Sequence, residues 1–148
     1  MLNRILLPID SSEHSKKAIE HVIQLAKKLN SKVIIAHAYE IPGEISLIAG
    51  KYGVHNNSIT QEIEKNLISH ADMIMGKTKM EIEGQGIKVE AMVIKGAAGN
   101  AIVEIARTEN IDLIVMCGRN LSPIERVLLG SVSDYVIHHA KCPVMLVH

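Results

Sequence analysis

The chain has 148 residues, and its sixteen lysines and arginines balance sixteen aspartates and glutamates, so the formal net charge is zero. A neutral chain without Trp or Phe lacks the clustered cations and the aromatic platforms that nucleic-acid binding uses. Apolar residues make up 47% and charged residues 22%, which is typical of an ordered globular protein and excludes a disordered one. We therefore expect one domain spanning residues 1–148.

The sequence also bears on where the protein acts. No stretch approaches the run of about 18 uncharged apolar residues that a membrane-spanning helix needs. The first residues lead into a short apolar run without a signal-peptide cleavage pattern. Cys117 and Cys142 form no Cys-x-x-Cys pair, which favours reduced thiols. We expect a cytoplasmic protein that contacts neither a membrane nor nucleic acid.

Short apolar runs recur along the chain and predict its strands. Runs that are apolar on both faces are typical of a parallel sheet covered by helices on each side. Residues 87–93 differ, because apolar and polar side chains alternate there, and this period of two predicts a half-exposed edge strand. The uniformly apolar runs are residues 5–7, 33–36, 113–116 and 144–147.

Helical patterns separate these runs. Apolar residues recur at helical spacing and predict helices over about residues 12–29, 58–83, 99–109 and 131–139. The alternation of strands and helices predicts a doubly wound, Rossmann-like α/β fold with right-handed crossovers and helices on both faces of the sheet. Residues 40–57 interrupt the alternation of strands and helices, and they contain Pro42, Gly43, Gly50 and Gly53. We interpret this long connection either as a lid or as an insertion that contacts nothing.

Ligands of open α/β sheets bind beyond the carboxyl ends of the strands. Residues 8–12, 37–39 and 117–120 should lie there, and Gly130 and Ser131 open the last helix. The free N–H groups of a helix start favour phosphate, and the hydroxyls of Ser131 and Ser133 add donors. The alternative is that residues 131–134 form a capping box that needs no ligand, as residues 10–13 do for the first helix.

Four segments carry a resemblance to a known family. Together they resemble the universal stress protein family along the whole chain and in the right order, and the last segment is highly specific. The resemblance implies a five-stranded parallel sheet in the order 3-2-1-4-5, which makes the third strand an edge, and an adenine-nucleotide site at its carboxyl edge. The segments are ILLPIDSSEHSKKAIEHV, VIIAHAYE, IVMCGRN and VLLGSVSDYVIHHAKCPVMLV.

Nucleotide-binding members of the family carry a G-x2-G-x9-G-[ST] motif after strand four. Gly130 and Ser131 match its end, whereas Cys117 and Asn120 stand where the first two glycines are expected; Gly118 lies one place over. The resemblance implies that Asp10 contacts the adenine or ribose end and that the backbone of Ala38 reads the adenine edge. The ligand it implies is ATP or a related adenine nucleotide, with or without Mg²⁺. The expected binding residues are Pro8, Asp10, Ala38, Gly118, Gly130, Ser131 and Ser133.

No catalytic constellation can be named. The sequence lacks a nucleophile elbow, a Walker A loop and a recognised metal-ligand spacing, so we expect no metal site and at most slow ATP hydrolysis. His37 lies in an apolar strand, where a hydrogen-bonded core histidine is expected. Cys117 and Cys142 fall at opposite ends of neighbouring parallel strands, which excludes a disulfide between them. Cys117 lies near a helix start, which favours some thiolate character.

The last strand, residues 144–147, is apolar on both faces although the implied order places it at an edge. Such edges invite pairing with another chain, so we predict a homodimer through this strand. Two functions compete: a dimeric nucleotide-binding regulatory module, and a module with the same fold that binds no nucleotide and acts through protein contacts alone. A nucleotide-processing enzyme is the third and least supported reading.

Overall fold

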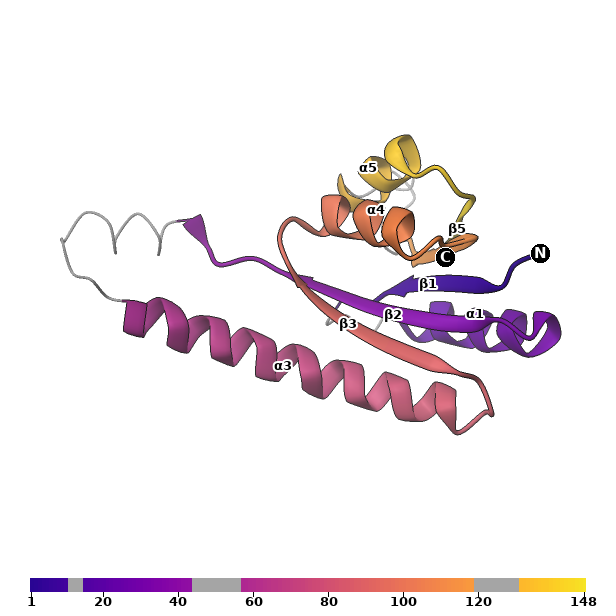
Figure 1. The fold of residues 1–148 in the computed structure, drawn as a ribbon, viewed down its shortest axis with the longest axis horizontal. Coiled ribbons are helices and arrows are strands. Elements are labelled where there is room, and N and C mark those ends of the chain that lie inside the picture. Colours follow the sequence, from indigo (N-terminus) through magenta and orange to yellow (C-terminus); the bar gives the residue numbers. More distant parts are fainter. Residues whose placement is uncertain (11–14, 44–56, 119–130) are drawn as a thin grey trace.

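A computed structural model describes residues 1–10, 15–43, 57–118 and 131–148, and every structural statement below concerns these residues. Its five strands are all parallel and lie in the order β3-β2-β1-β4-β5, which confirms the predicted sheet (Figure 1). The strands are β1 (Arg4–Pro8), β2 (Lys32–Tyr39), β3 (Val89–Lys95), β4 (Leu113–Cys117) and β5 (Val144–Val147). The helices are α1 (Ser15–Leu29), α3 (Asn57–Glu83), α4 (Ala98–Thr108) and α5 (Ser131–His139).

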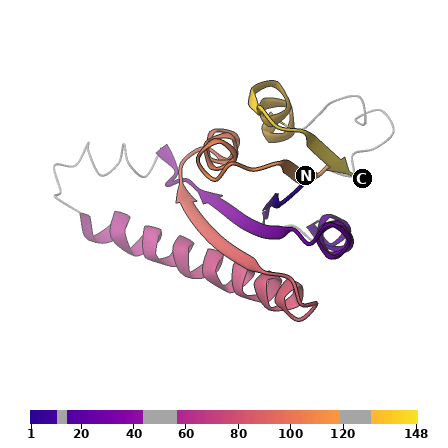
Figure 2. The same ribbon diagram turned by 45° about the vertical axis from the view of Figure 1, so that its right-hand side comes forward.

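Helices cover both faces of the sheet, because the central strands are apolar on both sides. Leu7 and Ile35 contribute to a core that α1 and α3 cover, whereas Leu6 and Ile34 contribute to a second core under α4 and α5. All four side chains are completely buried. The two helix layers are visible on opposite sides of the sheet when the molecule is turned (Figure 2). The alternation of side chains along each strand thus divides one apolar run between two cores.

The two edge strands differ in character. β3 carries exposed Glu90 and Ala91, and Glu90 forms an ion pair with Lys32 of β2, so this edge is partly polar as its alternating sequence predicts. β5 lies at the other end of the sheet and is apolar throughout, with Met145 36% exposed. The amide of Ile114 donates to the carbonyl of Pro143, just before β5, and the amide of Gly118 donates to the carbonyl of Val147 at its end. Alternate peptide groups of this strand therefore point away from β4.

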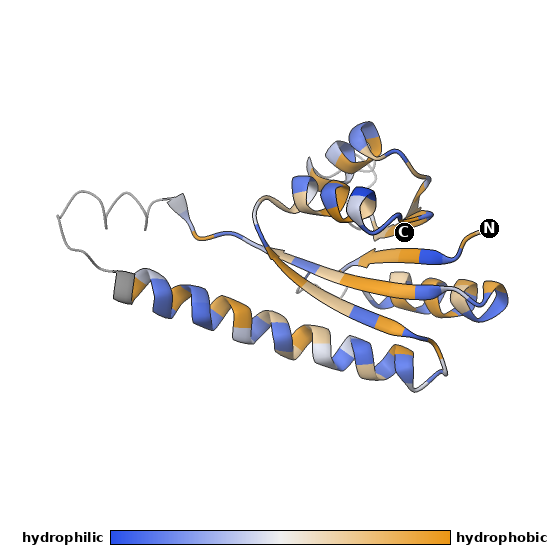
Figure 3. Cartoon of the chain, viewed as in Figure 1, coloured by the Kyte–Doolittle hydropathy of each residue, from blue (hydrophilic) through white to orange (hydrophobic). Residues whose placement is uncertain are grey.

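Each helix buries a stripe of its surface. In α1 the residues Ala18, Val22 and Ala26 face the sheet, and the colouring of α3 alternates between apolar and polar along its length (Figure 3). The predicted boundaries of α3, α4 and α5 agree with the structure to within one residue. Residues 11–14, 44–56 and 119–130 lie outside the described part, so the first capping box, the long connection after β2 and Gly130 stay predictions.

Close packing of α4 against α5 depends on Gly99. A Cβ atom built at Gly99 would lie 2.8 Å from the Cδ1 atom and 3.0 Å from the Cγ atom of Tyr135 in α5. The Tyr135 ring is itself stacked on His139, with 3.9 Å between ring centroids, and this contact restricts its movement. Gly76 in α3 offers a contrast, because nothing lies within 4 Å of the Cβ position there.

Gly99→Ala is expected to lower the free energy of unfolding by up to about 2 kcal/mol, because overpacking costs about 1–3 kcal/mol and the gain in helix propensity offsets only about 1 kcal/mol of it. Gly76→Ala is the matched control and is expected to raise it by up to about 1 kcal/mol. Urea unfolding of both variants measures the difference. Equal stabilisation by the two substitutions would contradict the packing argument.

Candidate functional site

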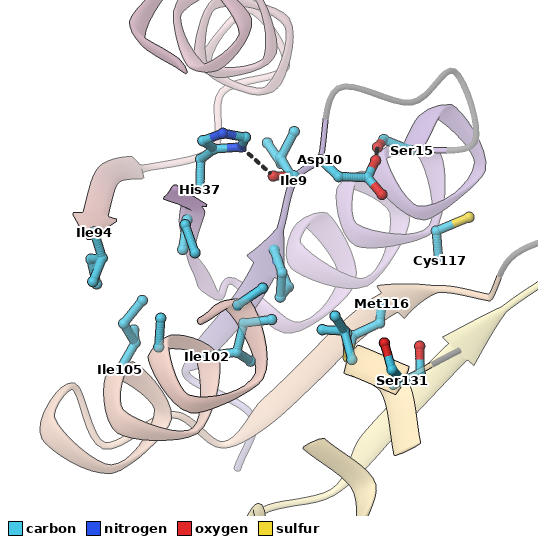
Figure 4. Close-up of a pocket in the computed structure, with 17 residues that line it drawn as sticks. Ile9, Asp10, Ser15, His37, Ile94, Ile102, Ile105, Met116, Cys117 and Ser131 are labelled. Atoms are coloured by element: carbon cyan, nitrogen blue, oxygen red, sulfur yellow. Dashed lines mark hydrogen bonds between the residues drawn. The ribbon is translucent and has the colours of Figure 1, made fainter. Parts of the chain in front are cut away.

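A pocket of about 140 Å³ opens at the carboxyl ends of the strands. It lies where β1 and β4 end beside β2, with α4 along one side and the start of α5 along another (Figure 4). This is the edge at which open α/β sheets bind ligands, because helix starts and loops gather there. Of the residues expected from the sequence, the structure brings five together in its lining: Pro8, Asp10, Ala38, Ser131 and Ser133.

One end of the pocket is apolar. The side chains of Ile94, Ile102 and Ile105 gather on this side (Figure 4), and Ala36 of β2 also lines the pocket. Ile102 and Ile105 are 5% and 3% exposed, so this end of the pocket is built from core residues rather than from a loose surface. An apolar chamber with small residues at its wall accepts a flat, weakly polar ring system.

The other end of the pocket is polar. Asp10 follows β1, and the hydroxyl of Ser15, at the start of α1, donates a hydrogen bond to its Oδ1 atom at 3.3 Å. Cys117 at the end of β4 and Ser131 at the start of α5 lie on the same side of the pocket as Asp10 (Figure 4). A carboxylate and hydroxyl groups at the mouth, with an apolar chamber behind them, match a ligand with one apolar and one hydrogen-bonding end.

The apolar wall is held in place from outside the pocket. Ala38 of β2 pairs with Ile94 of β3, and both line the pocket. The next residues in each strand bind Glu64 of α3: the hydroxyl of Tyr39 donates to its Oε1 atom at 2.9 Å, and Nζ of Lys95 lies 3.1 Å from the same atom. The hydrogen bond from Lys95 is the main cause that lowers the pKa of Glu64, followed by that from Tyr39. This cluster anchors α3 beside the pocket.

His37 is hydrogen-bonded, as expected from its apolar strand, but it is half-buried and lines the pocket instead of lying in the core. Its Nδ1 atom lies 2.8 Å from the carbonyl oxygen of Ile9. Because a carbonyl can only accept, Nδ1 must carry the proton. Neutral His37 therefore has its Nε2 atom as an acceptor. The ring ties the end of β2 to the residue after β1, next to Asp10.

Cys117 does not have the thiolate character expected from a helix start. Burial raises the pKa of the Cys117 thiol, and the negative charge of Asp10 raises it further, while Lys17 acts weakly in the opposite direction. The expectation had the wrong sign because burial, the largest cause, and the carboxylate of Asp10 both disfavour the thiolate. Cys117 and Cys142 are both free thiols, as predicted, and burial raises the pKa of Cys142 too.

Gly118 lies outside the pocket lining, although it was expected among the binding residues. Its amide donates to the carbonyl of Val147 at 2.8 Å, which extends the pairing of β4 with β5. A Cβ atom at Gly118 would lie 2.6 Å from the ring of His148. Gly118 therefore makes room for the residue after β5, a contact that a motif comparison does not reveal.

Sequence reasoning missed the contribution of α4 and of Ser15. Ala98, Ala101 and Ile102 line the pocket from α4, although the pattern had assigned the inward face of this helix to the core alone. The small residues in the first turns of α4 could have indicated a pocket there, since Ala98 and Ala101 leave space between this helix and the sheet. Ser15 was read only as part of the first helix, yet it bonds Asp10.

The structure shows no membrane-crossing helix among the residues it describes, because none is both long and apolar enough. Within the same residues, no three His, Cys, Asp or Glu side chains gather closely enough to hold a metal ion. The ring nitrogens of His21, His138 and His139 each lie 2.7–2.8 Å from a carbonyl of their own helix.

Comparison with known proteins shows to which family this chain belongs. The family model described as "Universal stress protein family" matches residues 1–148. This chain belongs to the universal stress protein family. The match confirms the resemblance seen in the sequence, and the sheet order agrees with it.

Relatives within the universal stress protein family match over most of their length. The universal stress proteins MJ0531 and MJ0577 of Methanocaldococcus jannaschii are 31% and 32% identical to this chain. Each alignment covers 99% of this chain, with 82% of MJ0531 and 95% of MJ0577. The solved structure of MJ0577 superposes with a TM-score of 0.82 at 30% identity and covers 99% of this chain and 96% of its own.

A nucleotide complex occurs among the solved universal stress proteins. One structure, described as a universal stress protein in complex with cAMP, superposes with a TM-score of 0.68 at 28% identity. The superposition covers 99% of this chain and 97% of that one. An adenine nucleotide therefore binds to a protein of the same family and fold.

Proposed function

We propose that this universal stress protein binds ATP or a related adenine nucleotide in the pocket at the carboxyl edge of the sheet and acts as a regulatory module. The observation that carries the proposal is the pocket itself, an apolar chamber beside a mouth that holds a carboxylate and hydroxyls. The cAMP complex of a family member supports it. The free cysteines are consistent with action in the cytoplasm, which belongs to the same proposal.

We place each part of the ligand against a different part of the pocket. The adenine enters the chamber between Ile94 and Ile102, and the backbone of Ala38 reads its edge. Asp10 accepts from the ribose hydroxyls, because an ionised carboxylate forms only acceptor contacts. Ser131 and Ser133 donate to phosphate at the start of α5, where N–H groups also point toward an anion. Pro8 shapes the wall at the end of β1.

Gly130 and Mg²⁺ complete this proposal. Gly130 precedes α5 and would let the chain approach a phosphate closely. Mg²⁺ commonly reaches such sites together with the phosphates and keeps several of its waters, so it needs few protein ligands.

Calorimetric titration with ATP, AMP and adenosine tests the proposal. We expect saturable binding of at least one of them below millimolar concentration, with thermal stabilisation of the protein by the bound ligand. GTP at the same concentrations is the control for base recognition. Absence of heat and of stabilisation with all three adenine compounds would refute nucleotide binding by this chain.

A second candidate function is favoured by Cys117. Its side chain lines the pocket at the place where the family motif has glycine, so the pocket holds atoms that a nucleotide-binding member lacks there. In this case the chain binds no nucleotide and acts through protein contacts alone.

Cys117→Gly separates the two candidates. If the thiol blocks the site, the variant is expected to bind ATP at least about tenfold more tightly than the natural chain, since one or two displaced groups account for about 1.4 kcal/mol. Cys142→Gly is the control, because Cys142 precedes β5 at the opposite edge of the sheet. Similar ATP affinity in the natural chain and in Cys117→Gly would leave the regulatory nucleotide binder standing.

We also propose that two copies associate through β5. This strand is at the end of the sheet order, its alternate peptide groups point away from β4, and its side chains are apolar. Antiparallel pairing of two such edges would continue the sheet across a twofold axis.

Met145→Lys is expected to shift the protein from dimer to monomer at micromolar concentration, because a charge on an edge strand opposes pairing. Met73→Lys is the matched control, since Met73 is also an exposed methionine, at 56%, but lies on α3. Sedimentation velocity distinguishes the species. A monomeric natural chain, or a dimer that survives Met145→Lys and dissociates with Met73→Lys, would refute the β5 interface.

A further inference from the structure

The charges of the pocket lining do not explain how the site would hold the negatively charged phosphates of the proposed ligand. Among the described lining residues the pocket holds one carboxylate, Asp10, and neither Lys nor Arg. A phosphate chain placed near Asp10 would be repelled, at about 1 kcal/mol for two unit charges 4 Å apart in water and more in a partly buried site. A cation beside the mouth would offset this repulsion.

Lys17 occupies such a place. It follows Ser15, which bonds Asp10, by two residues on α1. Its Nζ atom lies 3.4 Å from the main-chain oxygen of His148, the residue after β5, and the ring of His148 packs on Gly118. Gly118 follows Cys117, which lines the pocket. The ammonium group therefore stands beside the ends of β4 and β5, next to the polar mouth.

The contact between Lys17 and His148 is weak enough for the ammonium group to leave it and bind a ligand. Lys17 is exposed, and a separation of 3.4 Å is longer than the usual 2.7–3.2 Å of an N–H···O hydrogen bond. The lysine stem is flexible, with three donors on a compact charge, so it can turn from a carbonyl to a phosphate oxygen. The charge of Lys17 also reaches the pocket lining, because it acts on the pKa of the Cys117 thiol against Asp10.

We propose that Lys17 binds the outer phosphates of the nucleotide, so that the site prefers a nucleoside triphosphate to a monophosphate or a nucleoside. This inference rests on the proposed nucleotide binding and adds its specificity. A phosphate chain that crosses the end of β4 meets the start of α5 on one face of the sheet and Lys17 on the other.

Calorimetric titration of Lys17→Gln with ATP, AMP and adenosine tests the inference. The variant keeps a long polar side chain and loses the charge. We expect ATP affinity to fall about tenfold, the size typical of a lost hydrogen bond between charged groups, and adenosine affinity to change by less than about twofold. Lys17→Arg is expected to restore most of the ATP affinity. Lys16→Gln, an exposed lysine one position earlier on the same helix, is the control and should leave all three ligands unchanged.

Salt supplies a second readout, because contacts with phosphate weaken as ionic strength rises. ATP affinity of the natural chain should fall more steeply with salt than that of Lys17→Gln. An equal loss for ATP and adenosine would assign Lys17 a structural role and overturn the inference. So would unchanged ATP binding in Lys17→Gln; normal adenosine binding in that variant would show that the nucleotide site itself stands. If the natural chain binds none of the three, the proposed function fails and the inference fails with it.

Discussion

Ala98→Trp is expected to abolish nucleotide binding and leave the fold intact. Ala98 is the first residue of α4, it is half-buried, and it lines the pocket mouth. An indole at this position would occupy much of a pocket of about 140 Å³. The expected loss of affinity for ATP is at least about 100-fold, or about 2.8 kcal/mol.

Asn100→Trp is the matched control for this prediction. Asn100 lies in the same first turn of α4 but is exposed. Both substitutions cost the helix only a few tenths of a kcal/mol, as Trp is less favourable than Ala by up to about 0.7 kcal/mol. Thermal unfolding of both variants checks the fold, and calorimetry with ATP checks the site. Undiminished binding by folded Ala98→Trp would place the ligand elsewhere.

Asp10→Asn is expected to weaken adenosine binding about tenfold. The substitution keeps the shape of the side chain and replaces a charged acceptor by a neutral one, which changes a hydrogen bond from about 1.5–3 to about 0.5–1.5 kcal/mol. ATP is expected to lose less than adenosine, because the same change removes the repulsion between Asp10 and the phosphates. Titration with both ligands measures the difference. Equal losses for ATP and adenosine would contradict the placement of Asp10 near the phosphates.

The same variant has a readout that requires no ligand. The negative charge of Asp10 is the second cause, after burial, that raises the pKa of the Cys117 thiol. Removing this charge must lower that pKa, so the pH at which alkylation of Cys117 reaches half its maximal rate should move downward. Asp72→Asn, an exposed carboxylate on α3, is the control and should leave it unchanged. An upward movement in Asp10→Asn would contradict the geometry of the polar mouth.

The sheet could be predicted from the sequence because its signals are local and consistent. Apolar runs such as residues 33–36 require burial on both faces, and in a chain that alternates strands with helices a parallel sheet between two helix layers provides it. The alternation around Glu90 identified an edge without any structural information. The exact order of the strands came from family resemblance, since local patterns do not specify which strands pair.

The site could be predicted only in part, because a pocket depends on contacts between distant residues. Asp10 and Ala38 follow strands, and their position at the carboxyl edge is a consequence of topology. The packing of Gly118 against His148 joins the ends of two strands and leaves no pattern in the sequence. The raised pKa of the Cys117 thiol likewise follows first from its burial and then from the charge of Asp10, neither of which a helix-start argument contains.

The most direct test of the account is an NMR titration of the ¹⁵N-labelled protein with ATP. We predict that the amides of Ala38, Ile94 and Ala98 shift in a saturable manner, since these residues line the pocket from three different elements. The amides of Lys32 and Asn110, at the opposite edge of the sheet, should stay in place. Shifts confined to the surroundings of Lys32 and Asn110, or no shifts with millimolar ATP, would contradict nucleotide binding in this pocket.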